Sequence, residues 1–370
     1  MIFARTRSAR RASPDYLIIT CFTILVIFGL AMISSASSHL GKIKFNDTYY
    51  YLKHQLAYGL SLGIIGFFLM SRIYYKRLEK FALPFLIISL GLLVLVFTPL
   101  GVKTKGAARW VNIGPITFQP SEIIKITFLV YLASWLSRRD ERQTDFKKGL
   151  VPFFIIISVI ASLLIKQPST STVAILLLTA FIVYFMSGSK LSYTLGIILI
   201  SAAIFLIIIF STPYRFERVK SFLDPTQNLE TSSFHLNQAL IAIGSGGLTG
   251  VGYGQSTTKI SYLPEPVGDS IFAVIAEEFG FIGSTVLITV YLILIFRIFN
   301  LSRKVRDKFA KLLLIAFGSI IAIQTCVHIA AISGLLPLTG TPLPFISYGG
   351  TALAVFMTMA GIIVNISKYA

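Results

Sequence analysis

Charged residues are scarce in this sequence, and acidic residues are the scarcer kind: 15 Asp and Glu stand against 33 Lys and Arg among 370 residues. About a quarter of the residues in an ordinary soluble domain are charged. Here the charged fraction is 13%, and the hydrophobic fraction is 55%. So few charges cannot cover the surface of soluble domains, and the composition predicts an integral membrane protein.

Cysteine is nearly absent, and the spacings that identify metal, nucleotide and triad sites are missing. Cys21 and Cys326 both fall in apolar runs without a CxxC or Cys–His spacing, so we expect two small buried hydrophobic residues. His235 and His328 lack acids at a useful spacing, which favours local hydrogen bonding over catalysis. No GxxxxGK[ST] pattern is present, so no nucleotide site is expected.

The excess of basic residues gives a formal net charge of +18, which could indicate a nucleic-acid-binding protein. These residues occur in short clusters between apolar runs, however. The positive-inside rule places such clusters in the cytoplasmic loops of membrane proteins. We therefore expect no nucleic-acid partner.

Apolar runs long enough to cross a bilayer, about 20 residues each, recur along the whole chain. They predict an all-α membrane bundle of about ten transmembrane helices, preceded by a basic cytoplasmic arm at 1–15 and forming one membrane domain over 16–370. An even number of spans places both termini in the cytoplasm. The predicted spans are 16–36, 54–71, 81–98, 120–137, 150–166, 171–187, 191–211, 270–297, 312–333 and 351–367.

The longest stretch without a predicted span is the extracytoplasmic loop 211–269, and loops of this length usually carry function. It contains Arg215 and Arg218, whose guanidinium groups could bind an anionic ligand bidentately. Its glycine-rich part, Gly244–Gly254, has two interpretations. The backbone N–H groups could cradle a phosphate, or the glycines could form a tight turn, which is the commoner case.

Two adjacent acids, Glu277 and Glu278, lie inside the eighth predicted span. A carboxylate at membrane depth costs at least ~2.5–3.5 kcal/mol, so each needs a partner, a water-filled cavity or a proton. A proton relay is one interpretation. Structural pairing with a lysine or a helix end is the simpler one.

Asp269 precedes the same span in a setting that suits a catalytic base. Pro264 and Pro266 hold the chain extended, and Gly268 allows it to turn before a helix begins. Asp269 then lies near a helix N-terminus at a water-facing mouth, where it could stay ionised and accept a proton from a substrate. Glu265 is a second acid in this segment.

Further polar candidates occur in two other outer segments. Arg109 precedes the fourth span, and Glu122 and Lys125 share one face of it because they are three residues apart. That pair either joins two helices as an ion pair or contacts substrate directly. Ser347 lies in Leu335–Gly350, whose prolines and glycines prevent a continuous helix; such backbone is tolerated at membrane depth only where protein or a water-filled cavity covers it.

Five motifs, in this order, carry a resemblance to the SEDS family of FtsW, RodA and SpoVE. They are KGAARWVNIGPITFQPSE (Lys105–Glu122), RFERVKSFLDP (Arg215–Pro225), ALIAIGSGGLTGVGYG (Ala239–Gly254), YLPEPVGDSIFAVIAEEFGFIG (Tyr262–Gly283) and LPLTGTPLPFISYGG (Leu336–Gly350). The resemblance implies ten transmembrane helices in the bacterial cytoplasmic membrane. It also implies a peptidoglycan glycosyltransferase that polymerises lipid II at the outer face.

The resemblance also implies roles for individual residues. Asp269 matches the family's catalytic aspartate, which is proposed to deprotonate the acceptor sugar hydroxyl. Arg109, Arg215 and Arg218 are candidates to hold the pyrophosphate of the donor, and further candidate substrate contacts are Glu122, Lys125, Glu265 and Ser347. A divalent cation on the pyrophosphate is chemically plausible, but no spacing identifies its ligands, and no cofactor is assigned.

Within the family, ITFQPSEIIKITFLVYLASWLSRR and the LLPLTG segment resemble FtsW more than RodA, which favours division over elongation. Either subtype implies a class B penicillin-binding protein and further divisome or elongasome proteins as partners. Two other functions remain open, a lipid II flippase and a non-catalytic scaffold. A flippase needs polar groups through both leaflets, whereas here they gather outside. The chain departs from the family pattern at Ser169 and Ser171, which stand where Asp and Gly are usual.

Overall fold

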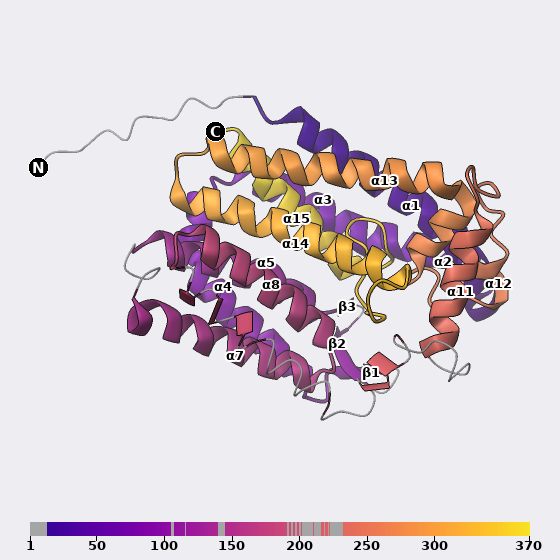
Figure 1. Ribbon diagram of the computed structural model, residues 1–370, viewed down its shortest axis with the longest axis horizontal. Coiled ribbons are helices and arrows are strands. Elements are labelled where there is room, and N and C mark those ends of the chain that lie inside the picture. The colour runs from indigo at the N-terminus through magenta and orange to yellow at the C-terminus, as the bar shows by residue number, and fades with distance from the viewer. Residues whose placement is uncertain are drawn as a thin grey trace, which may run out of the picture.

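The protein is described here by a computed structural model, in which most of the chain forms a bundle of long helices. It describes residues 13–104, 107–114, 116–139, 145–190 and 232–370, and between them 192–193, 195–196, 198–199, 201, 210, 216–217, 219–220 and 222. The helices lie roughly side by side, with the connections gathered at the two ends of the bundle (Figure 1).

Most of the described helices overlap the predicted spans. In chain order they are α1 (Tyr16–Phe45), α2 (Tyr50–His54), α3 (Ser61–Arg72), α4 (Lys76–Leu95), α5 (Pro120–Ser137), α7 (Val151–Lys166), α8 (Thr170–Met186), α11 (Ser232–Ser245), α12 (Thr258–Ser261), α13 (Ile271–Lys304), α14 (Lys308–Ile332) and α15 (Gly350–Ser367). Two π-helical turns, η1 (Gln55–Leu60) and η2 (Phe146–Leu150), lead into α3 and α7. However, α1 and α13 run well past their predicted ends, and α11 and α12 lie in the predicted loop.

Seven helical stretches in the described part of the chain are long and apolar enough to cross a membrane. The apolar α8 is slightly shorter, and α5 packs beside it against α4 and α14. The prediction of an all-α membrane bundle of about ten helices is therefore confirmed. The seventh predicted span, 191–211, falls mostly outside the described residues.

Several helices begin where local chemistry predicts. The Asp15 carboxylate accepts a hydrogen bond from the N–H of Ile18 at the start of α1, and Asp307 does the same for Ala310 at the start of α14. Pro120 occupies the first turn of α5, where its missing N–H costs nothing. These caps satisfy N–H groups that have no partner within the helix.

A small antiparallel sheet, which the sequence did not predict, forms in the segment before α5. Its strands are β1 (Gly101–Thr104), β2 (Ala107–Ile113) and β3 (Ile116–Phe118), in the order β1-β2-β3. Gly114 has a φ of 63° between β2 and β3, a conformation that glycine adopts without strain. The strands therefore give the segment before α5 a regular structure, and Arg109 lies on β2.

The first and last described helices meet at one end of the bundle. The backbone N–H of Asp15 donates to the Ser367 hydroxyl at 3.0 Å, and Arg297 Nε donates to the Asp15 carboxylate at 2.7 Å. At this terminal end, Lys76 pairs with Asp307 at 3.0 Å. The shared position of the two ends agrees with an even number of spans.

The interior of the bundle is mostly apolar and centres on α14, which contacts α5, α8 and α13. Cys21 is buried in α1, as predicted, but Cys326 on α14 is exposed. The prediction of a buried Cys326 was wrong because an apolar run does not reveal which side of a helix faces its neighbours and which faces lipid.

Candidate active site

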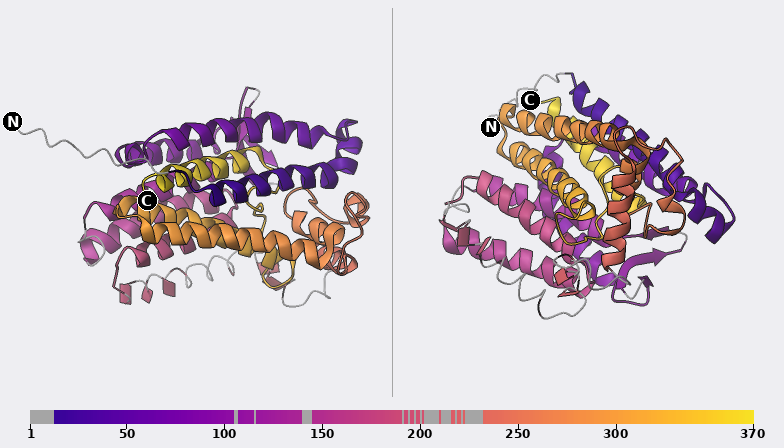
Figure 2. Two further views of the ribbon diagram at one scale, coloured as in Figure 1. Left: turned by 90° about the horizontal axis from the view of Figure 1, so that it is seen from above. Right: turned by 45° about the vertical axis from the view of Figure 1, so that its right-hand side comes forward.

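The end of the bundle opposite the start of α1 and the end of α15 includes several short segments (Figure 2). The helices α11 and α12, drawn in salmon and orange, lie there beside the start of α13. The α14–α15 connection, residues 333–349, lies at this end too. We call this end of the bundle the Asp269 end, because the loop Tyr262–Ser270 places Asp269 here, just before α13.

Asp269 lies half-buried two residues before the first residue of α13, which confirms its predicted position at a helix N-terminus. Within this loop, Pro266 and Val267 are buried, whereas Glu265 is exposed. A Cβ added at Gly340 would lie 3.3 Å from Asp269 Oδ2. The carboxylate therefore faces the α14–α15 connection, at a point where the absent side chain leaves it room.

Ser347 fastens the Asp269 loop to the α14–α15 connection. Its hydroxyl donates to the Gly268 carbonyl at 2.9 Å and accepts from the Leu343 N–H at 2.8 Å. The N–H of Tyr348 also donates to the Val267 carbonyl at 2.8 Å. Ser347 stays a predicted substrate contact, and in the structure its hydroxyl holds the backbone beside Asp269.

Tyr348 adds a contact to the start of the second predicted span. Its hydroxyl lies 3.0 Å from His54 Nδ1. Burial, together with the neighbouring Tyr50 and Tyr51, raises the pKa of the Tyr348 phenol. The phenol therefore stays protonated and joins α2 to the connection as a neutral hydrogen-bonding group.

His235 on α11 supports the same loop from the other side. Its Nε2 lies 2.6 Å from the Ser270 hydroxyl, and that hydroxyl donates to the Pro264 carbonyl at 2.7 Å. Because the hydroxyl proton is used there, His235 Nε2 must be the donor. Local hydrogen bonding, the interpretation favoured from the sequence, is confirmed for His235.

The Glu122–Lys125 pair is a buried ion pair on α5. Lys125 Nζ lies 2.7 Å from Glu122 Oε1, and the two side chains are 1% and 3% exposed. Lys125 also donates to Gln324 Oε1 on α14 at 3.0 Å. The ion pair that the sequence left as one of two alternatives is therefore present, and it links α5 to α14.

Arg109, the candidate cation on β2, contacts the turn between α7 and α8. Its Nε donates to the Gln167 carbonyl at 3.2 Å and its terminal nitrogen to the Pro168 carbonyl at 2.5 Å. These bonds anchor the sheet on the α7–α8 turn. The other candidate cations, Arg215 and Arg218, lie outside the described residues.

Glu277 and Glu278, the costly acids of α13, both have partners. Glu278 Oε1 lies 2.6 Å from Lys259 Nζ on α12, and the two side chains are 0% and 3% exposed. The Ser35 hydroxyl also donates to Glu278 at 2.5 Å. Glu277 accepts from the Ser256 hydroxyl at 2.6 Å and the Thr257 N–H at 3.0 Å. Pairing with a lysine and a helix end was the simpler prediction, and it is correct.

Nothing in the sequence pointed to Lys259 or Ser35 as these partners. Lys259 lies 19 residues before Glu278, and Ser35 lies 243 residues before it. No helical or strand spacing relates such positions, so only the tertiary fold brings them together.

The glycine-rich segment is a tight turn packed on a kink in α13. At the kink, Gly280 has φ 64° and ψ −163°. This non-helical conformation interrupts the hydrogen bonds of the helix, so nearby backbone groups can bind partners outside it. The carbonyls of Glu277 and Glu278 accept from the N–H groups of Val251 and Gly252, both at 3.0 Å. These N–H groups are therefore occupied by backbone carbonyls, which supports the tight turn over a phosphate cradle.

Replacing Gly280 with alanine is expected to destabilise the protein by several kcal/mol. This combination of φ and ψ is essentially restricted to glycine and costs other residues about 1–3 kcal/mol, and the new Cβ would lie 2.4 Å from the Gly250 nitrogen. Thermal unfolding in detergent measures the effect. The matched control is Gly91→Ala in α4, where the added Cβ meets no described atom within 4 Å beyond its chain neighbours and the nearby backbone of its own helix; an equal loss of stability in both variants would contradict this account of the kink.

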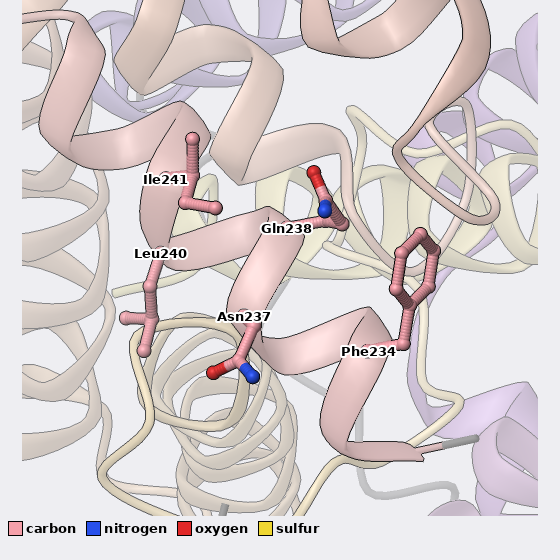
Figure 3. A pocket seen from close by; sticks show the side chains of 5 residues that line it. All are labelled: Phe234, Asn237, Gln238, Leu240 and Ile241. Atoms are coloured by element: carbon pink, nitrogen blue, oxygen red, sulfur yellow. The ribbon is translucent and has the colours of Figure 1, made fainter. Parts of the chain in front are cut away.

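A shallow pocket opens on the outer face of α11 (Figure 3). Five side chains line it: Phe234, Asn237, Gln238, Leu240 and Ile241. It combines an aromatic ring and two carboxamides with aliphatic groups, close to the segment that carries His235. Among the described residues, no group of three or more His, Cys, Asp or Glu side chains is placed to hold a metal ion, and a divalent cation stays a prediction.

The fold and the site together define a multi-pass membrane protein with a half-buried carboxylate at one end of a helical bundle. Its sequence matches the model of the FtsW, RodA and SpoVE cell cycle proteins over residues 15–370, and the chain belongs to this family.

Similar proteins are known by sequence and by structure. Stage V sporulation protein E of Bacillus subtilis is 33% identical, over 98% of this chain and 99% of its own. A probable peptidoglycan glycosyltransferase FtsW of Trichlorobacter lovleyi is 35% identical, over 97% and 94%. A chain of a peptidoglycan synthase complex matches with a TM-score of 0.79 and 26% identity, over 96% and 97%. Thermus thermophilus RodA matches with a TM-score of 0.71 and 25% identity, over 96% of each chain.

Proposed function

We propose that this protein is a peptidoglycan glycosyltransferase that polymerises lipid II at the outer face of the bacterial cytoplasmic membrane during cell division. Its family membership and the names of its FtsW relatives support this activity. The observation that carries the proposal is Asp269, an acid whose loop is fastened to α11 and to the α14–α15 connection.

In the proposed reaction, Asp269 accepts the proton of the 4-hydroxyl of the acceptor N-acetylglucosamine. The oxygen attacks the anomeric carbon of the donor, and the bond from that carbon to the undecaprenyl pyrophosphate breaks. The N-terminus of α13 favours the ionised carboxylate, so the base is ready at neutral pH. Cations near the leaving pyrophosphate would stabilise its charge, and Arg109, Arg215 and Arg218 remain the candidates.

The proposed orientation puts the terminal end in the cytoplasm and the Asp269 end outside. It is supported by basic residues at the terminal end, where Lys76 and Arg138 pair with Asp307 and Glu79 and where Lys368 donates to the Ser71 carbonyl, as the positive-inside rule expects. We propose a class B penicillin-binding protein as the partner, supported by the similarity to a chain of a complex that coordinates polymerization and crosslinking. RodA-like elongation is the alternative subtype.

The test is a lipid II polymerisation assay on the purified protein, with and without its cognate penicillin-binding protein. We expect glycan strands on a gel, in greater amount with the partner present. A flippase would instead move labelled lipid II across vesicle membranes, even with Asp269→Ala. Such transport, together with a failure of the unchanged protein to form glycan strands, would overturn the proposal.

A further inference from the structure

A line of buried polar contacts runs through the bundle from α5, by way of α14, to the α14–α15 connection. It begins at the Glu122–Lys125 ion pair, continues through Gln324, and ends on the Pro342 carbonyl of the connection. Polar groups are costly in such an interior unless each is paired. The position of this line is therefore well determined, and its far end lies in the segment that carries Gly340 and Ser347.

Gln324 is the central contact of the line, and it is fully buried. Its Oε1 accepts from Lys125 Nζ at 3.0 Å, and its Nε2 donates to the Pro342 carbonyl at 2.7 Å. An ammonium group only donates hydrogen bonds, so the amide can have only this orientation. The ion pair thus determines which way Gln324 points and what it offers to Pro342.

His328 makes a parallel contact one helical turn further along α14. Its Nδ1 lies 2.8 Å from the Thr341 carbonyl, and a carbonyl can only accept, so Nδ1 carries the proton. His328 Nε2 is buried and has no hydrogen-bond partner in the described part of the chain. The bond to Thr341 is therefore the polar contact that the ring contributes.

The α14–α15 connection depends on such contacts because it has no helical ladder of its own. The connection meets the Asp269 loop at three points. Ser347 binds the Gly268 carbonyl, Tyr348 binds the Val267 carbonyl, and Gly340 faces the Asp269 carboxylate. Any shift of the connection would move the loop that bears Asp269.

We infer that Gln324 and His328 are positioning residues, which set the place of Asp269 by holding the carbonyls of Pro342 and Thr341. The buried ion pair on α5 then serves as the anchor of this arrangement. The expected effect of these two residues on kcat rests on the proposed function, whereas their expected effect on the structure of the α14–α15 connection does not.

The test uses variants that break one contact at a time in the full-length protein. Gln324→Glu keeps an acceptor for Lys125 but places a carboxylate oxygen against the Pro342 carbonyl, and Gln324→Met removes both contacts. His328→Leu removes the bond to Thr341, and His328→Asn restores a donor at the position of Nδ1. Ser319→Ala is the control, since Ser319 is buried in α14 without a hydrogen-bond partner among the described residues.

The first measurement is hydrogen–deuterium exchange at the amides of Leu343, Ser347 and Tyr348. Loss of a buried hydrogen bond should speed their exchange roughly tenfold in the Gln324 variants and in His328→Leu. Exchange in His328→Asn and Ser319→Ala should match that of the unchanged protein. Unchanged exchange in both Gln324→Met and His328→Leu would overturn the inference, whatever happens to activity.

The second measurement is lipid II polymerisation by the folded variants with the penicillin-binding partner. A displaced base should lower kcat roughly 10- to 100-fold and leave KM for lipid II unchanged, with His328→Asn restoring kcat. Faster exchange with full kcat would also overturn the inference. Absence of polymerisation in the unchanged protein would refute the proposed function instead, and the exchange test would still decide the structural part.

Discussion

Replacing Asp269 with asparagine is expected to abolish glycan polymerisation and to leave the protein folded. Asparagine has nearly the same shape but cannot accept the proton of the acceptor hydroxyl. A positioned general base contributes roughly 10²- to 10⁴-fold to a rate, so strand formation should fall by at least the lower of these factors. The measurement is the amount of glycan on a gel after a fixed time with saturating lipid II.

The control for this variant is Asp47→Asn. Asp47 is another acid near the Asp269 end, where it forms an exposed ion pair with Lys53 at 2.7 Å. Losing such a pair changes stability by less than about 1 kcal/mol, and activity should be retained. Undiminished glycan strands from Asp269→Asn, made by protein with a normal melting temperature, would remove Asp269 from the reaction and favour a scaffold role.

Lys259→Met is expected to destabilise the protein strongly. This change leaves Glu278 buried without its cation, and the carboxyl must then stay charged without compensation or take up a proton. Removing one member of a buried ion pair costs about 3–5 kcal/mol. Because Lys259 also donates to Ser35 and to the Gly254 carbonyl, contacts of α12 with α1 and the glycine turn should weaken as well. Thermal unfolding in detergent measures the loss.

Two comparisons separate the ion pair from general damage to the fold. The double variant with Lys259→Met and Glu278→Leu removes both charges and should recover much of the lost stability, because well-packed apolar groups can replace a buried pair. Lys53→Met breaks an exposed pair in which Lys53 is 67% exposed and should have little effect. Equal melting temperatures for Lys259→Met and the unchanged protein would show that this pair contributes nothing.

Much of the helical framework could be predicted from the sequence. Predicted span 120–137 coincides with α5, and 351–367 differs from α15 by one residue at its start. Some boundaries were predictable because proline marks a helix start and basic clusters interrupt apolar runs. Others were not, since α1 continues to Phe45 and α14 begins at Lys308. The small sheet was missed, since strands of three to seven residues in a mixed segment leave no clear alternating pattern.

The candidate site could be predicted only in part. The prolines and Gly268 correctly placed Asp269 before a helix, and helical spacing correctly suggested the Glu122–Lys125 pair. The use of Ser347 as a backbone anchor, the two carbonyls held by Gln324 and His328, and the docking of Arg109 on the α7–α8 turn were not predictable. Each joins segments far apart in the chain, where spacing carries no information.

The sequence by itself determined that this chain is a membrane bundle, roughly where most of its spanning helices lie, and which acid precedes α13. Hydropathy, capping and charge clusters are properties of neighbouring residues, so they can be interpreted without a fold. Only the tertiary structure decided how the buried charges are paired and what holds Asp269 in place. Those choices depend on which helices pack together, because a buried charge is stabilised by whatever partner the packing brings within hydrogen-bonding distance.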